Sequence, residues 1–383
     1  MRYFKILGIF IKGNSGDEVE GIKYRFMLII GYLGAVIGAG FASGQEIVQF
    51  FVTYGANGAK GVLLATALFG ICGGLLLYKA HDQKAANYQD MLKHLLGHRL
   101  GMAGDFLLAI FLFLGISTML SASGAVFYEH LYLPKNLGIF LAYILIVVLL
   151  ASGKKGLIFS YNLLVPIKIV LLLLISGYAA FFIEANQPEV YALTFNEEGD
   201  WSWLISSILY VSYNFALAMV VLTEYQSVTN RRNGILGAAW GGLILGGLVI
   251  INYYSLCKFL PDVMHYQVPM LYVAGHINLT AKHLYTMVLW LGIITTAIAN
   301  AYGFAQRFSK FTGLSYRICL VLSITLALPL SLQSFSSLVA KIYPLFGILG
   351  VTIIAALLYK TIKEIGLELY YRVIQLFRRI KEA

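Results

Sequence analysis

The sequence has little charge. Only 12% of its 383 residues are Asp, Glu, Lys or Arg, whereas 59% are hydrophobic. This balance excludes the ordinary soluble globular class. No polar block longer than about 25 residues interrupts the apolar runs, which leaves no room for a separate soluble domain. The chain is therefore predicted to be an all-α polytopic membrane protein.

Cysteines and enzyme motifs are scarce as well. The three cysteines, Cys72, Cys257 and Cys319, are too far apart for a metal motif and too few for a disulfide framework. The sequence contains no P-loop, HExxH or GxSxG motif. The stretch from Gly38 to Ser43 approximates a dinucleotide-binding GxGxxG, but it ends in serine and lacks a βαβ context. We therefore predict no enzymatic activity, no cofactor and no firm metal site.

Long apolar runs dominate the rest of the chain. About ten of them reach the length of roughly 20 residues with which a helix spans a bilayer. An even number of spans places both chain ends on the same side of the membrane. The predicted spans are roughly 26–53, 58–78, 104–129, 136–152, 157–183, 202–226, 234–257, 284–306, 316–332 and 338–360.

Lysine and arginine, which give the chain a net charge of +10, are distributed very unevenly. With ten spans, 22 of the 28 basic residues fall in the tails and loops of one side, five fall on the other side, and Lys168 lies inside a span. The positive-inside rule then places both termini in the cytoplasm. The basic excess marks membrane topology, so we predict the lipid bilayer as a partner and no nucleic acid.

Dividing ten spans after the fifth yields two halves that enter the membrane from opposite sides, the topology of an inverted repeat. The predicted order is a cytoplasmic tail (1–25), a first five-helix repeat (26–183), an outer loop (184–201), a second five-helix repeat (202–360) and a cytoplasmic amphipathic tail helix (361–383). Within the second repeat, the outer connection 260–283 is consistent with a short capping helix or with a plain surface loop.

The first span is predicted to be broken near its middle. It contains three glycines between positions 38 and 44, beside Ser43 and Glu46, and these residues destabilise a helix or are costly in hydrocarbon. The freed backbone groups must find partners in protein or water, because lipid offers none. By symmetry we expect an interruption of the sixth span near Ser212 to Asn214, although no glycine or proline marks it and a continuous helix stays open.

Lys168 is the most informative single residue, because it lies too deep in the fifth span to reach either interface easily. By the helical rise, Gly38, Lys168 and the pair Thr295 and Thr296 all lie roughly 16 to 20 Å from the cytoplasmic edge. They can therefore meet near the membrane centre. An intramembrane ionisable residue is a functional candidate, and this ammonium would occupy or titrate within a cation site. The alternative is a structural lysine that caps carbonyls freed by Pro166.

Other polar residues are weaker candidates. Glu46 follows the break, where a helix N-terminus would stabilise its carboxylate; a role as proton carrier or substrate contact is equally consistent. Ser117, Ser121, Tyr213 and Asn214 are plausible pocket groups. Serine, however, often hydrogen-bonds its own helix, so each such residue alone is a weak signal.

The run from Gly34 to Glu46, GAVIGAGFASGQE, and the ten-span layout resemble the bacterial YkvI-type membrane proteins, a branch of the amino acid, polyamine and organocation transporter superfamily with a LeuT-type layout. The resemblance implies a bacterial cytoplasmic membrane protein, a five-plus-five inverted repeat and discontinuous helices one and six. Substrate would lie between those two helices. The implied contacts are backbone groups of Gly38, Ala39, Gly40, Phe41, Ala42 and Ser43 on the first helix, and of Ser212 to Phe215 on the sixth.

The resemblance also implies an ion position between spans one and eight. Gly38, Thr295 and Thr296 would be candidate sodium ligands there. In sodium-independent relatives a lysine on the fifth span fills this position, and Lys168 matches it by location. The chain thus carries marks of both coupling schemes, and the lysine favours protons.

The leading hypothesis is a secondary transporter for a small solute, most simply an amino acid, coupled to protons or less readily to sodium. Half-helix ends offer amide donors to a carboxylate and carbonyls to an ammonium, which favours a zwitterion. The alternative is a membrane sensor that binds ligand without moving it. A channel fits less well, because no ring of charges or filter sequence is present.

Overall fold

The protein is described by a computed structural model that covers residues 15–85, 87–185, 201–266, 268–333, 335, 338, 342 and 346–364. Within these ranges every regular element is helical, as predicted from the sequence. The elements are α1 (Ser15–Val36), α2 (Ala39–Ser43), α3 (Gln45–Phe50), η2 (Val52–Tyr54), α4 (Gly55–Gln83), α5 (Tyr88–Leu96), α6 (His98–His130), α7 (Lys135–Leu150), α8 (Lys154–Phe182), α10 (Ser202–Tyr225), α11 (Arg231–Cys257), η3 (Asp262–His265), α12 (Pro269–Ile277), α13 (Leu279–Thr312), α14 (Tyr316–Ser331) and a last helix, Phe346–Glu364.

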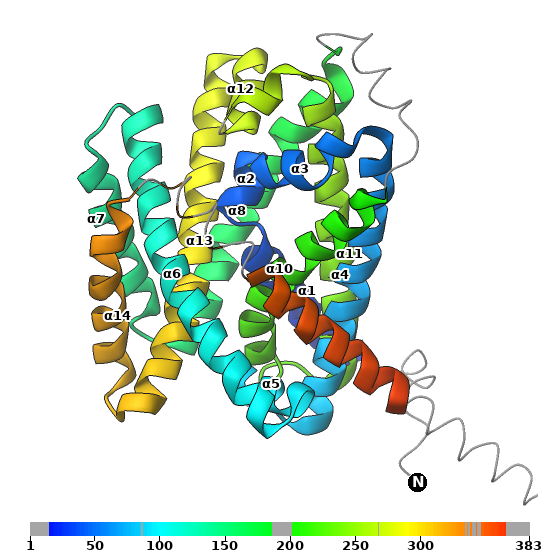
Figure 1. Cartoon of the computed structure of the whole chain (residues 1–383), viewed down its shortest axis with the longest axis vertical. Coiled ribbons are helices and arrows are strands. Elements are labelled where there is room, and N and C mark those ends of the chain that lie inside the picture. The colour runs from blue at the N-terminus through cyan, green and yellow to red at the C-terminus, as the bar shows by residue number, and fades with distance from the viewer. Residues whose placement is uncertain are drawn as a thin grey trace, which may run out of the picture.

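The long helices pack side by side into one bundle (Figure 1). Seven segments of the described chain are long and apolar enough to cross a membrane: Gln45–Gln83, α6, α8, α10, α11, α13 and Phe346–Glu364. Two shorter apolar helices, α7 and α14, lie together at the left of Figure 1. The membrane class is therefore confirmed, while the count of ten crossings stays a prediction.

Basic residues of the predicted cytoplasmic segments are joined to polar groups at one end of the bundle. Their side chains link helices that are distant in sequence, so these segments do lie together. Which end faces the cytoplasm stays a prediction. The links are Lys79 with Glu364, Lys360 with the His94 carbonyl, Lys154 with Glu224 (3.1 Å), Arg307 with Asp105 (2.5 Å), Lys310 with Gln89 (2.7 Å) and Arg25 with Asn233 (2.8 Å).

The sixth span differs from the symmetric expectation, because α10 is one continuous helix from Ser202 to Tyr225. The expected interruption near Ser212 to Asn214 was wrong. Two polar side chains bond within the helix: Asn214 Nδ2 donates to the Tyr210 carbonyl at 3.0 Å, and Ser207 Oγ donates to the Trp203 carbonyl at 2.6 Å. Such local bonds leave the helical ladder intact, and α10 contains no glycine or proline to break it.

The outer connection 260–283 forms short helices instead of a plain loop. η3 and α12 follow α11, and α12 lies above α2 at the top of Figure 1. The α12 residues Met270 and Val273 are fully buried. A Cβ atom on Gly44 would lie 2.7 Å from Met270 Cγ, so α12 packs directly over the bend in the first span.

Three predicted segments fall mostly outside the described residues. The tail 1–25 is described from residue 15, where α1 begins, and the outer loop 184–201 is described only at its two ends. Of the predicted tail helix 361–383, residues 361–364 continue the last helix. The amphipathic remainder, and the division into two repeats, stay predictions.

The last helix makes a very close contact with α10 through Gly350. A Cβ atom there would lie 2.1 Å from the Ser212 carbonyl oxygen, and backbone cannot move aside as a side chain can. We expect Gly350→Ala to lower the midpoint of thermal unfolding by several degrees. Gly347→Ala is the matched control, because its Cβ would meet Leu209 at an ordinary 3.5 Å. Equal midpoints for the two variants would contradict this packing.

Candidate functional site

The first predicted span is broken, as expected, at Gly38. Helix α1 ends at Val36. Gly38 follows with extended backbone (φ −94°, ψ −162°), and the five-residue helix α2 begins directly after it. The chain bends again at Gly44, whose left-handed backbone (φ +80°) separates α2 from α3. Glycine adopts this conformation without the steric cost that a side chain adds. Figure 1 shows the two short helices crossing the middle of the bundle beyond the end of α1.

Lys168 reaches this break from α8. Its side chain is fully buried, and its Nζ donates to the Ile37 carbonyl oxygen at 2.5 Å and to Thr295 Oγ1 at 2.7 Å. The Ile37 carbonyl follows the last residue of α1 and belongs to the backbone that the break takes out of the helix. The lysine thus binds a carbonyl freed in the first span, whereas the structural alternative had it cap carbonyls beside Pro166.

Thr295 and Thr296, both on α13, also lie beside the break in the first span. Thr295 Oγ1 accepts from Lys168 and donates to the Leu291 carbonyl at 3.0 Å. Thr296 Oγ1 is buried without a hydrogen-bond partner, and a Cβ atom on Gly38 would lie 2.5 Å from it. The predicted sodium ligands Gly38, Thr295 and Thr296 are therefore brought together, with the ammonium already bound to one of the two hydroxyls.

Two tyrosines at this site were missed by sequence reasoning. The Tyr161 hydroxyl donates to the Thr295 carbonyl at 3.1 Å, and the Tyr225 ring would lie within 2.6 Å of a Cβ atom on Gly31. Both rings are fully buried. A signal was present in α1, where Gly31 and Gly34 face these rings, but nothing in the sequence pairs those glycines with particular aromatics.

Glu46 lies in α3, directly after the bend at Gly44. Its carboxyl group interacts with the side chains of Tyr213 and Asn214 on α10, two of the predicted pocket residues. Its Oε1 lies so close to Gly40 that a Cβ atom there would be 1.8 Å away. The rings of Phe50 and Tyr213 are 5.7 Å apart. The structure thus joins the break in the first span to the middle of α10, as the sequence predicted.

The remaining predicted residues of the break hold the bend or pack in the core. Ser43 Oγ donates to the Gly40 carbonyl at 2.8 Å and accepts from the Gln45 amide at 3.2 Å, which holds the bend at Gly44. The three apolar predicted contacts of α2 are buried in the core: Ala39, Phe41 and Ala42. Their predicted contacts to substrate stay predictions.

The two predicted serines of α6 contribute differently. Ser121 Oγ donates to the Gln333 carbonyl at 2.6 Å, so its hydroxyl already has a partner on another part of the chain. Ser117 Oγ is buried and has no hydrogen-bond partner. Asn300, which the sequence analysis did not single out, approaches α6 so closely that a Cβ atom on Gly115 would lie 2.3 Å from its Nδ2. Neither serine is joined to the α1 break by a described hydrogen bond.

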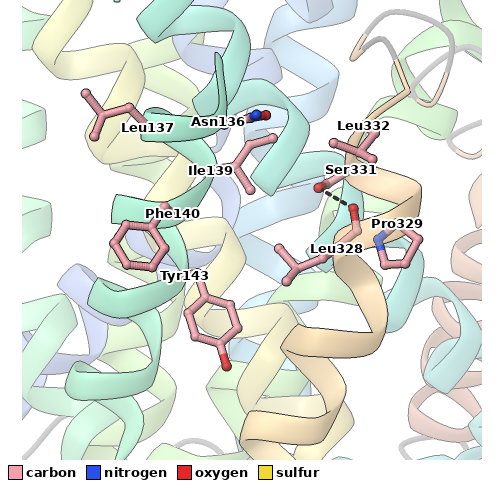
Figure 2. A pocket seen from close by; sticks show the side chains of 9 residues that line it. All are labelled: Asn136, Leu137, Ile139, Phe140, Tyr143, Leu328, Pro329, Ser331 and Leu332. Atoms are coloured by element: carbon pink, nitrogen blue, oxygen red, sulfur yellow. Dashed lines mark hydrogen bonds between the residues drawn. The ribbon is translucent and has the colours of Figure 1, made fainter. Parts of the chain in front are cut away.

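A separate groove of about 860 Å³ lies between α7 and α14 (Figure 2). Apolar side chains dominate its walls, and Phe140 and Leu332 are 59% and 64% exposed. No predicted site residue lines it, so it suits hydrocarbon chains better than a polar solute. The lining residues are Asn136, Leu137, Ile139, Phe140, Tyr143, Leu328, Pro329, Ser331 and Leu332.

Solved structures with a similar fold are membrane transporters. A Na⁺-coupled sialic acid symporter matches with a TM-score of 0.63 at 12% identity, covering 87% of this chain and 78% of that one. MhsT in complex with L-phenylalanine matches with 0.56 at 19% identity, covering 86% and 88%. A manganese transporter from Eremococcus coleocola matches with 0.59 at 11% identity, covering 91% and 78%. The chain therefore has the LeuT-type fold.

Sequence relatives identify the family. No family model matches the chain. It is 30% identical over 332 residues to the membrane protein YkvI of Bacillus subtilis (strain 168), covering 86% of this chain and 94% of YkvI. It is 27% identical over 338 residues to YyaD of the same strain, covering 87% and 95%. The chain belongs to the YkvI family of membrane proteins.

Proposed function

We propose that the protein is a secondary active transporter that moves a small solute, most simply an amino acid, by alternating access coupled to protons. The observation that carries the proposal is the contact of the Lys168 ammonium with both the Ile37 carbonyl and Thr295 Oγ1. A positive charge here lies between an element of the first span and one of the eighth. Two neighbours in structure, a sialic acid symporter and a manganese transporter by their titles, support the same class.

Protons are favoured over sodium because a fixed cation already uses the oxygen ligands of the site. Carbonyl and hydroxyl oxygens are typical ligands of a hard cation such as sodium, and Lys168 takes one of each. An amine can release its charge by losing a proton, whereas a bound sodium must leave. Gain and loss of that proton would give the site the two states that ion coupling needs.

A zwitterionic solute is favoured by the mixture of groups around the break. Thr296 Oγ1 and Ser212 Oγ are buried and unpartnered, and the Glu46 carboxyl group interacts with Tyr213 and Asn214. Hydroxyl and amide groups can bind a carboxylate, while a carboxylate can bind an ammonium. MhsT, which shares the fold, was solved with L-phenylalanine.

Gradient-driven uptake tests this proposal. Purified protein in proteoliposomes should accumulate at least one labelled amino acid when an inward pH gradient is imposed, and dissipating the gradient should stop accumulation. A sodium gradient of equal size at constant pH should drive less uptake. Binding of an amino acid without any gradient-dependent flux would instead indicate a sensor.

We also propose that the protein lies in a bacterial cytoplasmic membrane with both termini inside. The 22 basic residues of one side support this orientation, and several of them are bonded to acidic or carbonyl groups of other predicted cytoplasmic segments. A reporter that is active only in the cytoplasm, fused after Ala383, should be active. If a reporter that folds only outside the cytoplasm were active when fused at the same position, the assignment would be reversed.

A further inference from the structure

Glu46 lies where the break in the first span is open to approach. Most residues from Ile37 to Gly44 are buried, but Gly40, Glu46 and Phe50 are all partly exposed. Glu46 and Phe50 are four residues apart in α3 and therefore share one face of it. The partly exposed side chains next to the break therefore include a carboxylate.

Several main-chain acceptors at the break are already in use, whereas the Glu46 carboxyl group, which interacts with Tyr213 and Asn214, keeps one oxygen free. Carbonyl oxygens of the bend accept from Lys168, from backbone amides or from Ser43. Glu46 Oε2, in contrast, is buried with no hydrogen-bond partner. The bonded carbonyls are those of Ile37, Gly38, Gly40 and Phe41. One acceptor that stays unpaired at this site is thus a carboxylate oxygen.

Aromatic rings surround the carboxylate on the α10 side. The Phe50 ring lies 5.5 Å from Tyr210 and 5.7 Å from Tyr213, and the two tyrosine rings are 5.8 Å apart. Tyr210 and Tyr213 both interact with the Glu46 carboxyl group. Ring faces are electron-rich and attract organic cations, as a carboxylate does. We call Glu46, Phe50, Tyr210 and Tyr213 the carboxylate–aromatic cluster.

No cation of the described chain neutralises this cluster. The four ion pairs among the described residues do not include Glu46, and Lys168 directs its ammonium to Ile37 and Thr295. Helix α3 has only six residues and makes no side-chain cap bond, so Glu46 does not serve as its cap. An unpaired carboxylate inside a membrane protein is costly and calls for a partner.

We propose that the carboxylate–aromatic cluster binds the ammonium group of the solute, with Glu46 as its charged ligand. This inference rests on the proposed function, since it assigns a subsite for the transported molecule. The proposal restricts the substrates to solutes that carry an amine. The carboxylate of an amino acid then contributes less to binding than its amine does. Lys168 keeps a separate role in ion coupling.

Binding to the purified full-length protein tests the subsite without any need for transport. The probes are the twenty L-amino acids, the amine that each yields on decarboxylation, and the acid that each yields on loss of its amino group. For the best-binding amino acid, its amine should compete and its deaminated acid should not. Glu46→Gln should weaken binding of the amino acid and of the amine by about 10- to 100-fold, because a charged hydrogen-bond partner is lost.

Gln49→Ala is the matched control, since Gln49 is exposed on the same helix. It should bind the probes as the wild-type protein does. The proposal is overturned if Glu46→Gln binds them with wild-type affinity, if the deaminated acid competes as well as the amine, or if no amine-bearing probe binds. Uptake is measured separately. If binding depends on Glu46 but no flux is seen, the proposed transport function is contradicted and the proposed amine subsite is still supported.

Discussion

Replacing Lys168 by alanine should lower pH-driven uptake by at least about tenfold. The variant loses two charge-assisted hydrogen bonds, to the Ile37 carbonyl and to Thr295 Oγ1, each of a kind that contributes about 1.5 to 3 kcal/mol. It also loses a basic group that lies near the middle of a predicted span. Removing it leaves two oxygen ligands without their cation. Uptake in proteoliposomes under an imposed pH gradient measures the effect.

The same variant distinguishes an ion-coupling lysine from a structural one. If Lys168 occupies a cation position, Lys168→Ala opens that position to sodium, and sodium-driven uptake should appear or increase. A purely structural lysine would lower the unfolding midpoint and all uptake together. Lys60→Ala is the control, because Lys60 is exposed and bonds only to its neighbour Asn57. Unchanged pH coupling in Lys168→Ala would remove this residue from the mechanism.

Replacing Gly40 by valine should weaken solute binding by at least about tenfold while the protein stays folded. A Cβ atom at this position would lie 1.8 Å from Glu46 Oε1 and 2.4 Å from its Cδ. These atoms end a flexible side chain, so the carboxyl group moves away and the backbone need not. The carboxylate–aromatic cluster then loses its charged member from the site. The factor assumes the loss of one hydrogen bond to a charged group.

Ligand binding by calorimetry, together with the thermal unfolding midpoint, measures both parts of this expectation. Gly247→Val in α11 is the control, because an added Cβ atom there meets nothing within 4 Å. It introduces the same β-branched residue into a helix without touching the site. If Gly40→Val binds the solute as tightly as Gly247→Val does, the pocket lies elsewhere in the protein.

Much of the fold could be predicted from local composition. The bilayer spans follow from long apolar runs, and the break at Gly38 follows from glycines and polar residues at a depth where neither suits a helix. Lys168 stood out because a buried amine needs partners, and its partners are on the elements expected. These predictions depend on which residues are unfavourable in hydrocarbon. That property can be read from each residue type without knowing how the helices pack.

The errors arose where the answer depends on how helices pack. α10 was expected to break because its symmetric counterpart does, yet its own side chains hold it together. The sequence also could not show that the Ser121 hydroxyl is bound to the Gln333 carbonyl, and its predicted place in a pocket stays a prediction. Tyr161 and Tyr225 resemble ordinary core aromatics in the sequence, and only helix register shows that they face the inner half of the first span.

The unequal behaviour of α1 and α10 has a consequence for selectivity. Where the first span comes apart, several of its main-chain carbonyls are already hydrogen-bonded, and the proposed ligand on this side is the carboxylate of Glu46. Opposite it, the intact α10 offers only side chains, among them Tyr213 and Asn214. Under the proposed subsite, relatives could therefore exchange one cargo for another by changing a few positions on α10, while Glu46 keeps its hold on the amine that these solutes share.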